Sequence, residues 1–182
     1  LSVDGAKFVM MAPMIPDYQE EPLFRNQNNS LIYSGKFAKE WYTEELLNAF
    51  ELLHQKDNTI SLNVAGDKFQ GELIPKSEEI ISRFKNQRGL NWQGALSRQK
   101  SLDLIKNSDL GIGWRSDLID NDLSLELSTK ILEYGQLGKP VLLRRTKMHE
   151  QLLGEDYELF VENENDFINK SLEVLYDRKL YR

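Results

Sequence analysis

Apolar and polar positions follow two repeating patterns along most of this chain. Short apolar runs predict strands, and between them apolar residues recur at the spacing that makes one face of a helix. The predicted strands are Leu31–Ser34, Ile60–Ala65, Leu90–Gln93, Leu110–Gly113, Val141–Leu143 and Glu158–Val161. The predicted helices are Thr43–Gln55, Ser77–Gln87, Ser97–Asn107, Ser128–Leu137, Lys147–Leu153 and Asn165–Tyr176. This alternation predicts an α/β fold with a parallel, Rossmann-like sheet of about six strands and helices on both faces.

The first thirty residues differ from the rest of the chain. Three prolines and a polar run from Asn26 to Ser30 are typical of a connector. We therefore expect residues 1–29 to be the remnant of an interdomain segment and residues 30–182 to form one domain. A chain of 182 residues can bury one good core but is too short for two full domains.

Composition excludes several classes of function. The net charge of −6 disfavours a nonspecific nucleic-acid binder, which needs cations to neutralise phosphates. The absence of cysteine excludes thiolate metal sites, and two histidines are too few for a His-rich site. We interpret Asp117, Asp120 and Asp122 as solvated turn residues, so no metal or other cofactor is expected. No apolar run approaches the ~20 residues of a membrane helix.

Candidate chemistry gathers where predicted strands end. After the first strand, Gly35 lets a ligand approach the backbone closely and Lys36 adds an ammonium group. From this motif alone, an ordinary turn with a solvated lysine is the favoured interpretation. After the third strand, the loop of residues 94–97 leads to Ser97, a predicted helix N-cap, and could pack against the edge of a base. His149 is a weak candidate for a general base because its segment is a loop that enters a short helix.

A predicted helix that begins near Ser128 carries the most informative pattern. Ser128 and Thr129 can cap this helix and leave N–H groups free for a phosphate, and Lys130 adds positive charge. Glu133, one turn further on, can accept hydrogen bonds from a ribose diol. It can equally be a solvated carboxylate that pairs with Lys130 or Lys139. From the residues alone, these two interpretations stay open.

Four segments in this order resemble a known family. They are Tyr33–Lys36, Ala65–Asp67, Gly94–Ser97 and the run STKILEY followed by GKPV between Ser128 and Val141. Together they resemble the C-terminal, donor-binding domain of GT-B glycosyltransferases, specifically the retaining nucleotide-sugar enzymes of family 4 (group 1). The resemblance covers Leu31 to about Tyr176. It implies the C-terminal half of the GT-B fold and transfer of a hexose from a nucleoside diphosphate sugar to an acceptor hydroxyl, without a metal.

The resemblance also implies roles for individual residues. Lys36, beside Gly35, would contact the donor diphosphate, and Glu133 would bind the ribose hydroxyls. The backbone around Ser128, Thr129 and Lys130 would hold phosphate. The loop that flanks the base would comprise Gly94, Leu96 and Ser97.

The chain departs from the family pattern at two positions. The family commonly places a second cation where this chain has Trp41, although Lys39 lies nearby, off register. The acidic partner of Glu133 is expected at position 125, and Glu126 stands one residue late. Contact between Glu126 and the sugar would therefore need a bulge or a shifted loop.

The same resemblance implies partners and a setting. An acceptor-binding domain is expected N-terminal to Leu1, with a saccharide or lipid-linked acceptor, a role in capsule or lipopolysaccharide synthesis, and a cytoplasmic location at the inner membrane face. This chain alone is expected to be inactive. Two alternatives stay open: a nucleotide-sugar epimerase built on the same plan, and a non-catalytic α/β interaction domain whose Lys36 and Glu133 are only surface charges.

Overall fold

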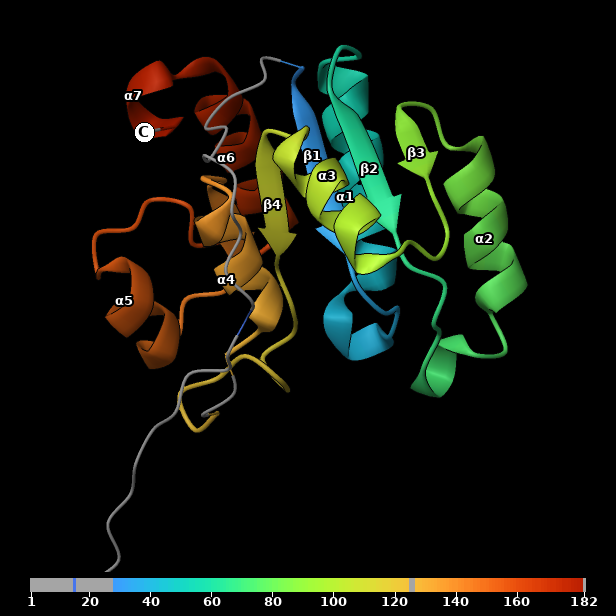
Figure 1. The fold of residues 1–182 in the computed structure, drawn as a ribbon, viewed down its shortest axis with the longest axis horizontal. Helices are drawn as coiled ribbons and strands as arrows, with labels where there is room; N and C mark the ends of the chain where they lie inside the picture. The colour runs from blue at the N-terminus through green and yellow to red at the C-terminus, as the bar shows by residue number, and fades with distance from the viewer. Residues whose placement is uncertain (1–14, 16–27, 125–126, 182) are drawn as a thin grey trace, which may run out of the picture.

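A computed structural model describes Ile15, residues 28–124 and residues 127–181. Nearly all of the predicted connector lies outside these residues. The described part forms three layers, with a parallel sheet between two layers of helices (Figure 1). None of the helices within these ranges combines the length and the apolar character needed to cross a bilayer.

The sheet contains five parallel strands in the order β3-β2-β1-β4-β5. Their bounds are Ser30–Ser34 (β1), Ser61–Ala65 (β2), Leu90–Trp92 (β3), Leu110–Gly113 (β4) and Val141–Leu143 (β5). Every residue of the central strand β1 is buried. This is the expected pattern for a parallel strand covered on both faces.

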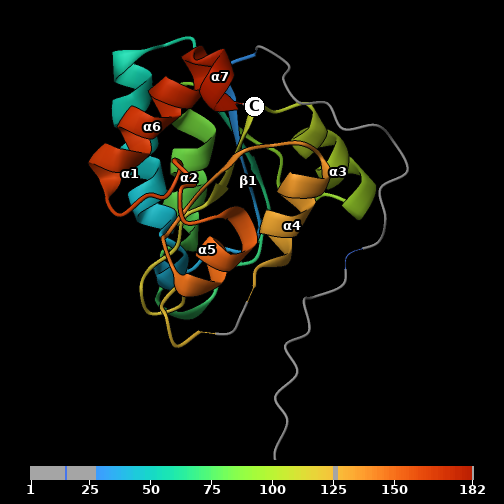
Figure 2. The same ribbon diagram turned by 90° about the vertical axis from the view of Figure 1, so that its left-hand side faces the viewer.

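Helices cover both faces of the sheet. The α-helices are Thr43–Lys56 (α1), Ser77–Asn86 (α2), Arg98–Lys106 (α3), Thr129–Gln136 (α4), Lys147–Leu153 (α5), Glu164–Tyr176 (α6) and Arg178–Tyr181 (α7). Two 3₁₀ turns are Lys39–Trp41 (η1) and Gly71–Leu73 (η2). Figure 2 shows α1 and α6 on one side of the sheet and α3 and α4 on the other. The predicted α/β architecture is therefore confirmed.

The two faces of the sheet support separate cores. Leu31 and Tyr33 of β1 pack into the core beneath α1, α2 and α6. Ile32, between them, packs into the core beneath α3 and α4, beside Tyr134 of α4. Successive side chains of a strand point to opposite faces, so one apolar strand contributes to both cores.

The predicted sixth strand, Glu158–Val161, is present only as a single bridge between Phe160 and Leu143 of β5. The Tyr157 side chain explains why a full sixth strand does not form. The hydroxyl of Tyr157 accepts a hydrogen bond from the Val141 N–H (2.9 Å) and donates one to the Val141 carbonyl oxygen (2.8 Å). These are the backbone groups of β5 that a full sixth strand would pair with.

The sheet order creates a crevice at one edge. The chain runs outward from β1 through β2 to β3, and then returns to place β4 on the other side of β1. All strands are parallel, so their carboxyl ends share one edge, and the connections beside β1 diverge there. Ligands of open α/β sheets bind at such a point.

Candidate functional site

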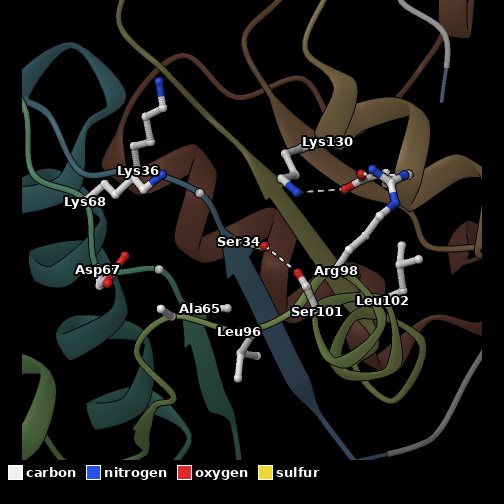
Figure 3. A pocket seen from close by; sticks show the side chains of 14 residues that line it. Ser34, Lys36, Ala65, Asp67, Lys68, Leu96, Arg98, Ser101, Leu102 and Lys130 are labelled. Carbon is white, nitrogen blue, oxygen red and sulfur yellow. Dashed lines mark hydrogen bonds and ion pairs between the residues drawn. The ribbon is translucent and has the colours of Figure 1, made fainter. Parts of the chain in front are cut away.

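A cleft of about 550 Å³ lies at the carboxyl edge of the sheet. Five segments line it: the turns that follow β1 and β2, the loop that follows β3, and the first turns of α3 and α4 (Figure 3). The lining residues with charged side chains are Lys36, Asp67, Lys68, Arg98, Lys130 and Glu133. Elements far apart in the sequence therefore supply one site.

Backbone contacts hold the turns after β1 and β2 together. The Gly35 N–H donates to the Ala65 carbonyl oxygen over 2.9 Å, and the Phe37 N–H donates to the Lys68 carbonyl oxygen over 2.8 Å. Gly66 has a φ of +141°, and a Cβ atom at this position would lie 2.0 Å from the Gly35 carbonyl oxygen. No side chain fits between the two turns, so the cleft has a tightly packed backbone on this side.

Glu133 lies on the opposite side of the cleft, on α4. Its side chain is 5% exposed and makes two ion pairs, with Lys130 Nζ at 2.8 Å and with an Arg98 guanidinium nitrogen at 3.3 Å. Arg98 reaches it from α3, which begins at the N-cap Ser97. A nearly buried carboxylate is therefore held by two cations at the wall of the cleft.

The charge of the cleft differs in sign from that of the whole chain. Four cations and two carboxylates line it, whereas the chain has a net charge of −6. Arg98 and Lys130, both paired with Glu133, leave a formal charge of +1 on one side, and Lys36, Lys68 and Asp67 leave +1 on the other, so the excess positive charge is spread over the whole cleft. This distribution suits an anionic ligand.

A second cavity of about 310 Å³ adjoins the first and shares Ser34, Gly35, Lys36 and Lys130 with it. Its other lining residues include Trp41, Arg115, Ser128 and Thr129. Lys36 Nζ lies 5.7 Å from the centre of the Trp41 ring, within the range of a cation–π contact. Lys36 therefore stands at the border of both cavities.

The family assignment rests on a match over nearly the whole chain. The family profile described as "Glycosyl transferases group 1" matches residues 14–182. The chain belongs to the group 1 glycosyltransferases. The resemblance inferred from the sequence motifs is thereby confirmed.

Solved structures of GT-B glycosyltransferases share the fold. S. aureus TarM has a TM-score of 0.66 at 14% identity, over 93% of this chain and 32% of its own. Anabaena HepE has a TM-score of 0.65 at 16% identity, over 85% of this chain and 41% of its own. The C-terminal domain of LpcC from Francisella tularensis has a TM-score of 0.65 at 14% identity, over 88% of this chain and 87% of its own. No protein of curated function matches the chain in sequence.

The chain covers different shares of these neighbouring structures. It spans about a third of the length of TarM but most of the solved C-terminal domain of LpcC. The five-stranded parallel sheet with flanking helices matches the Rossmann-like domains of GT-B glycosyltransferases. The described structure corresponds to one such domain.

The structure brings most of the predicted site residues of this glycosyltransferase domain together. Gly35, Lys36, Leu96, Lys130 and Glu133 line the large cleft. Ser128 and Thr129 line the adjoining cavity. The Ser128 hydroxyl accepts a hydrogen bond from the Lys130 N–H over 3.3 Å, so the predicted N-cap of this helix is confirmed.

Three predicted residues line neither cavity. Lys39 pairs with Glu72 at 2.9 Å, with both side chains more than half exposed, because η1 directs it toward η2. The Gly94 carbonyl oxygen accepts a hydrogen bond from the Gly66 N–H over 2.8 Å. The Ser97 hydroxyl caps α3. Glu126 lies outside the described residues.

The structure corrects the interpretation of Asp120 as a solvated turn residue. Its side chain is 2% exposed and forms an ion pair with Arg115, which the sequence pattern of this polar loop did not reveal. Asp122 accepts a hydrogen bond from the Lys147 N–H over 2.9 Å, and Asp117 is exposed. Across residues 28–124 and 127–181, no three acidic or histidine side chains are grouped as metal ligands.

His149 lines neither cavity. It is buried in α5, and its Nδ1 lies 2.7 Å from the Arg144 carbonyl oxygen. This position agrees with the interpretation of His149 as a weak candidate for a general base.

Sequence reasoning missed two cations of the cleft, Lys68 and Arg98. Both follow segments that the sequence did single out: Lys68 comes directly after the glycine turn of β2, and Arg98 directly after the N-cap Ser97. Their proximity to Lys36 and Glu133 depends on contacts between different βα units, which periodicity does not report.

Proposed function

We propose that this domain binds the nucleoside diphosphate sugar in an enzyme that transfers a hexose to an acceptor hydroxyl, with retention at the anomeric carbon. The observation that carries the proposal is Glu133, a 5% exposed carboxylate on the wall of a cleft with excess positive charge. A carboxylate and a set of cations in one cleft match the two ends of a nucleotide, the ribose diol and the phosphates.

The arrangement gives each part of the donor a place. Glu133 accepts hydrogen bonds from the ribose hydroxyls, as acidic residues do in dinucleotide folds. Lys36 and the first turn of α4 attract the diphosphate, since helix N-termini favour anions. The backbone of Ala95 and Leu96, at the end of the cleft nearest β3, is available to the base.

We take UDP as the first nucleotide to test. TarM was solved with UDP, HepE with UDP and glucose, and the pneumococcal transferase GtfA with UDP and GlcNAc. These ligands belong to those proteins, and the fold that they share with this chain is the support that they lend to UDP here.

The chemistry follows from the leaving group. The bond between the anomeric carbon and the diphosphate oxygen breaks, the acceptor oxygen bonds to that carbon, and the proton of the acceptor hydroxyl passes to the departing diphosphate. Negative charge grows on the departing diphosphate, and the nearby ammonium groups stabilise it. This role needs no metal, so we expect a chelator to leave nucleotide binding unchanged.

Thermal unfolding with UDP, GDP and ADP tests the proposal. A nucleotide that binds only the folded chain adds about 2.7 kcal/mol to its stability at a concentration 100 times Kd. We expect one of the three to raise Tm in a saturable manner. If none of them shifts Tm at millimolar concentration, the domain is better described as a non-catalytic interaction domain.

A second assay addresses the reaction. We expect the full-length protein, with its acceptor-binding domain, to transfer the sugar to a saccharide or lipid-linked acceptor and to function in surface polysaccharide synthesis at the cytoplasmic face of the membrane. Conversion of the donor to its epimer without transfer would contradict this. We expect the 182-residue chain alone to bind donor without turnover.

A further inference from the structure

We propose that Lys68 is a second diphosphate-binding cation of the donor site. The inference rests on the proposed function and extends it, since it names a binding residue to which the sequence motifs assigned no role. Four arguments support it: the position of Lys68, the absence of an ion pair at its ammonium group within the described residues, the charge of the ligand and the fixed backbone of the turn.

Lys68 lines the same cleft as Lys36. Figure 3 draws the two side chains next to each other, on the side of the cleft away from Arg98 and Lys130. The hydrogen bond from the Phe37 N–H to the Lys68 carbonyl oxygen, at 2.8 Å, holds the backbones of the two turns that carry these lysines in contact. An anion bound at Lys36 would therefore lie within the field of Lys68.

The other cations of the cleft are already engaged. Arg98 and Lys130 both pair with Glu133, and Lys36 lies over the Trp41 ring. Within the described residues, the ammonium group of Lys68 forms no ion pair, hydrogen bond or ring contact. It is exposed and available to a ligand.

The ligand needs more charge than Lys36 alone supplies. A departing diphosphate carries more than one negative charge, and cations hold it through charge-assisted hydrogen bonds. Trp41 offers an aromatic ring to the adjoining cavity and no charge. Lys68 adds the missing charge from the neighbouring turn.

The turn that carries Lys68 is fixed in place. Gly66 packs against the Gly35 carbonyl oxygen so closely that no Cβ atom fits, and the Gln70 N–H donates to the Phe37 carbonyl oxygen over 2.8 Å. The backbone of this turn needs no rearrangement to present the amine. Only the flexible lysine side chain has to settle on the ligand.

UDP affinity of matched single variants tests the assignment. We expect Lys68→Gln to weaken UDP binding by about tenfold, the loss of one charge-assisted hydrogen bond to phosphate. Uridine, which has no phosphate, should keep its affinity, measured by NMR titration. Lys85→Gln is the matched control, because Lys85 is also an exposed lysine, lies 5.8 Å from the Trp92 ring and does not line the cleft.

The neighbouring Asp67 tests whether the effect on UDP affinity follows the sign of the side-chain charge. It is exposed, lines the same cleft and carries the opposite charge. If the field of these side chains acts on a bound diphosphate, Asp67→Asn should strengthen UDP binding by about threefold, as expected for a unit charge about 6 Å away in water. A general disturbance of the turn would weaken binding in both variants, and that result would overturn the inference.

The outcomes separate the inference from the function on which it rests. If Lys68→Gln binds UDP within twofold of wild type while Lys36→Gln loses affinity, the inference fails and the proposed function stands. An equal loss of UDP and uridine affinity in Lys68→Gln would also overturn it. If the wild-type chain binds none of UDP, GDP and ADP, both the inference about Lys68 and the proposed function are wrong.

Discussion

Replacing Glu133 by glutamine separates its structural role from its proposed role in binding. The substitution keeps the shape of the side chain and removes its charge. It breaks the ion pairs with Lys130, at 2.8 Å, and with Arg98, at 3.3 Å. Both effects can be given a magnitude from the structure.

The effect on stability should be small. The Lys130 and Arg98 side chains are 33% and 52% exposed, so water can solvate both once the carboxylate is gone. Ion pairs with exposed cations contribute about 0–1 kcal/mol each to stability. The substitution also removes the unfavourable free energy of desolvating a nearly buried carboxylate. We expect the free energy of unfolding to change by less than about 1 kcal/mol.

The effect on binding should be larger. Hydrogen bonds to charged groups contribute about 1.5–3 kcal/mol, and the amide oxygen of glutamine retains part of this. We expect a loss of about 2 kcal/mol, or roughly thirtyfold in the Kd of UDP. Calorimetry and urea unfolding measure the two quantities on the same preparation.

A matched control accompanies this variant. Glu150→Gln breaks an ion pair of 2.6 Å with Arg145 away from both cavities, and it should leave UDP affinity unchanged. A Glu133→Gln chain that binds UDP within threefold of wild type would refute the assignment to the ribose. A loss of stability above about 3 kcal/mol would show that the carboxylate is mainly structural.

Three further predictions concern the scaffold. Gly66→Ala should lower the free energy of unfolding by at least about 2 kcal/mol, because this residue has a φ of +141° and its Cβ would clash with Gly35. An unchanged midpoint in urea titrations would contradict this. Ser128→Ala should cost about 1 kcal/mol through loss of the α4 N-cap, and retention of full stability would argue against the cap. Burial raises the pKa of Tyr157 to about 12 and raises the pKa values of Tyr33 and Tyr134 as well. Above pH 10 the unfolded chain therefore releases protons that the folded chain keeps, and the free energy of unfolding should fall by about 3 kcal/mol between pH 10 and 11. A flat profile over this range, checked by tyrosinate absorbance and thermal melts, would contradict the raised pKa values of these three tyrosines.

Local patterns predicted the regular elements of this fold well. Apolar periodicity and capping residues act within a few positions of the chain, so helix Lys147–Leu153 and strand Leu110–Gly113 have the predicted bounds. The Ser97 and Ser128 caps are confirmed for the same reason. The limits of local reasoning appear at residues 158–161, where the Tyr157 hydroxyl takes the backbone groups of Val141 that a longer strand would pair.

The candidate site was predictable in part. The motif around Glu133 was recognised in the sequence, but the sequence left open whether the carboxylate was solvated. Its burial and its ion pair with Arg98 depend on the approach of α3 to α4. Asp120, interpreted as a solvated turn residue, is buried for a different reason: the irregular backbone of its loop brings Arg115 into an ion pair with it, and periodicity does not predict the shape of such a loop. Lys68 becomes a candidate only because the turns after β1 and β2 are in contact.

The most direct test of the central claim is a crystal structure of the chain grown with saturating UDP. The account predicts UDP in the large cleft, with the ribose hydroxyls on Glu133, the diphosphate between Lys36 and Lys68, and the base against residues 95–96. UDP bound at another surface, or bound in the cleft with its ribose away from Glu133, would contradict the account.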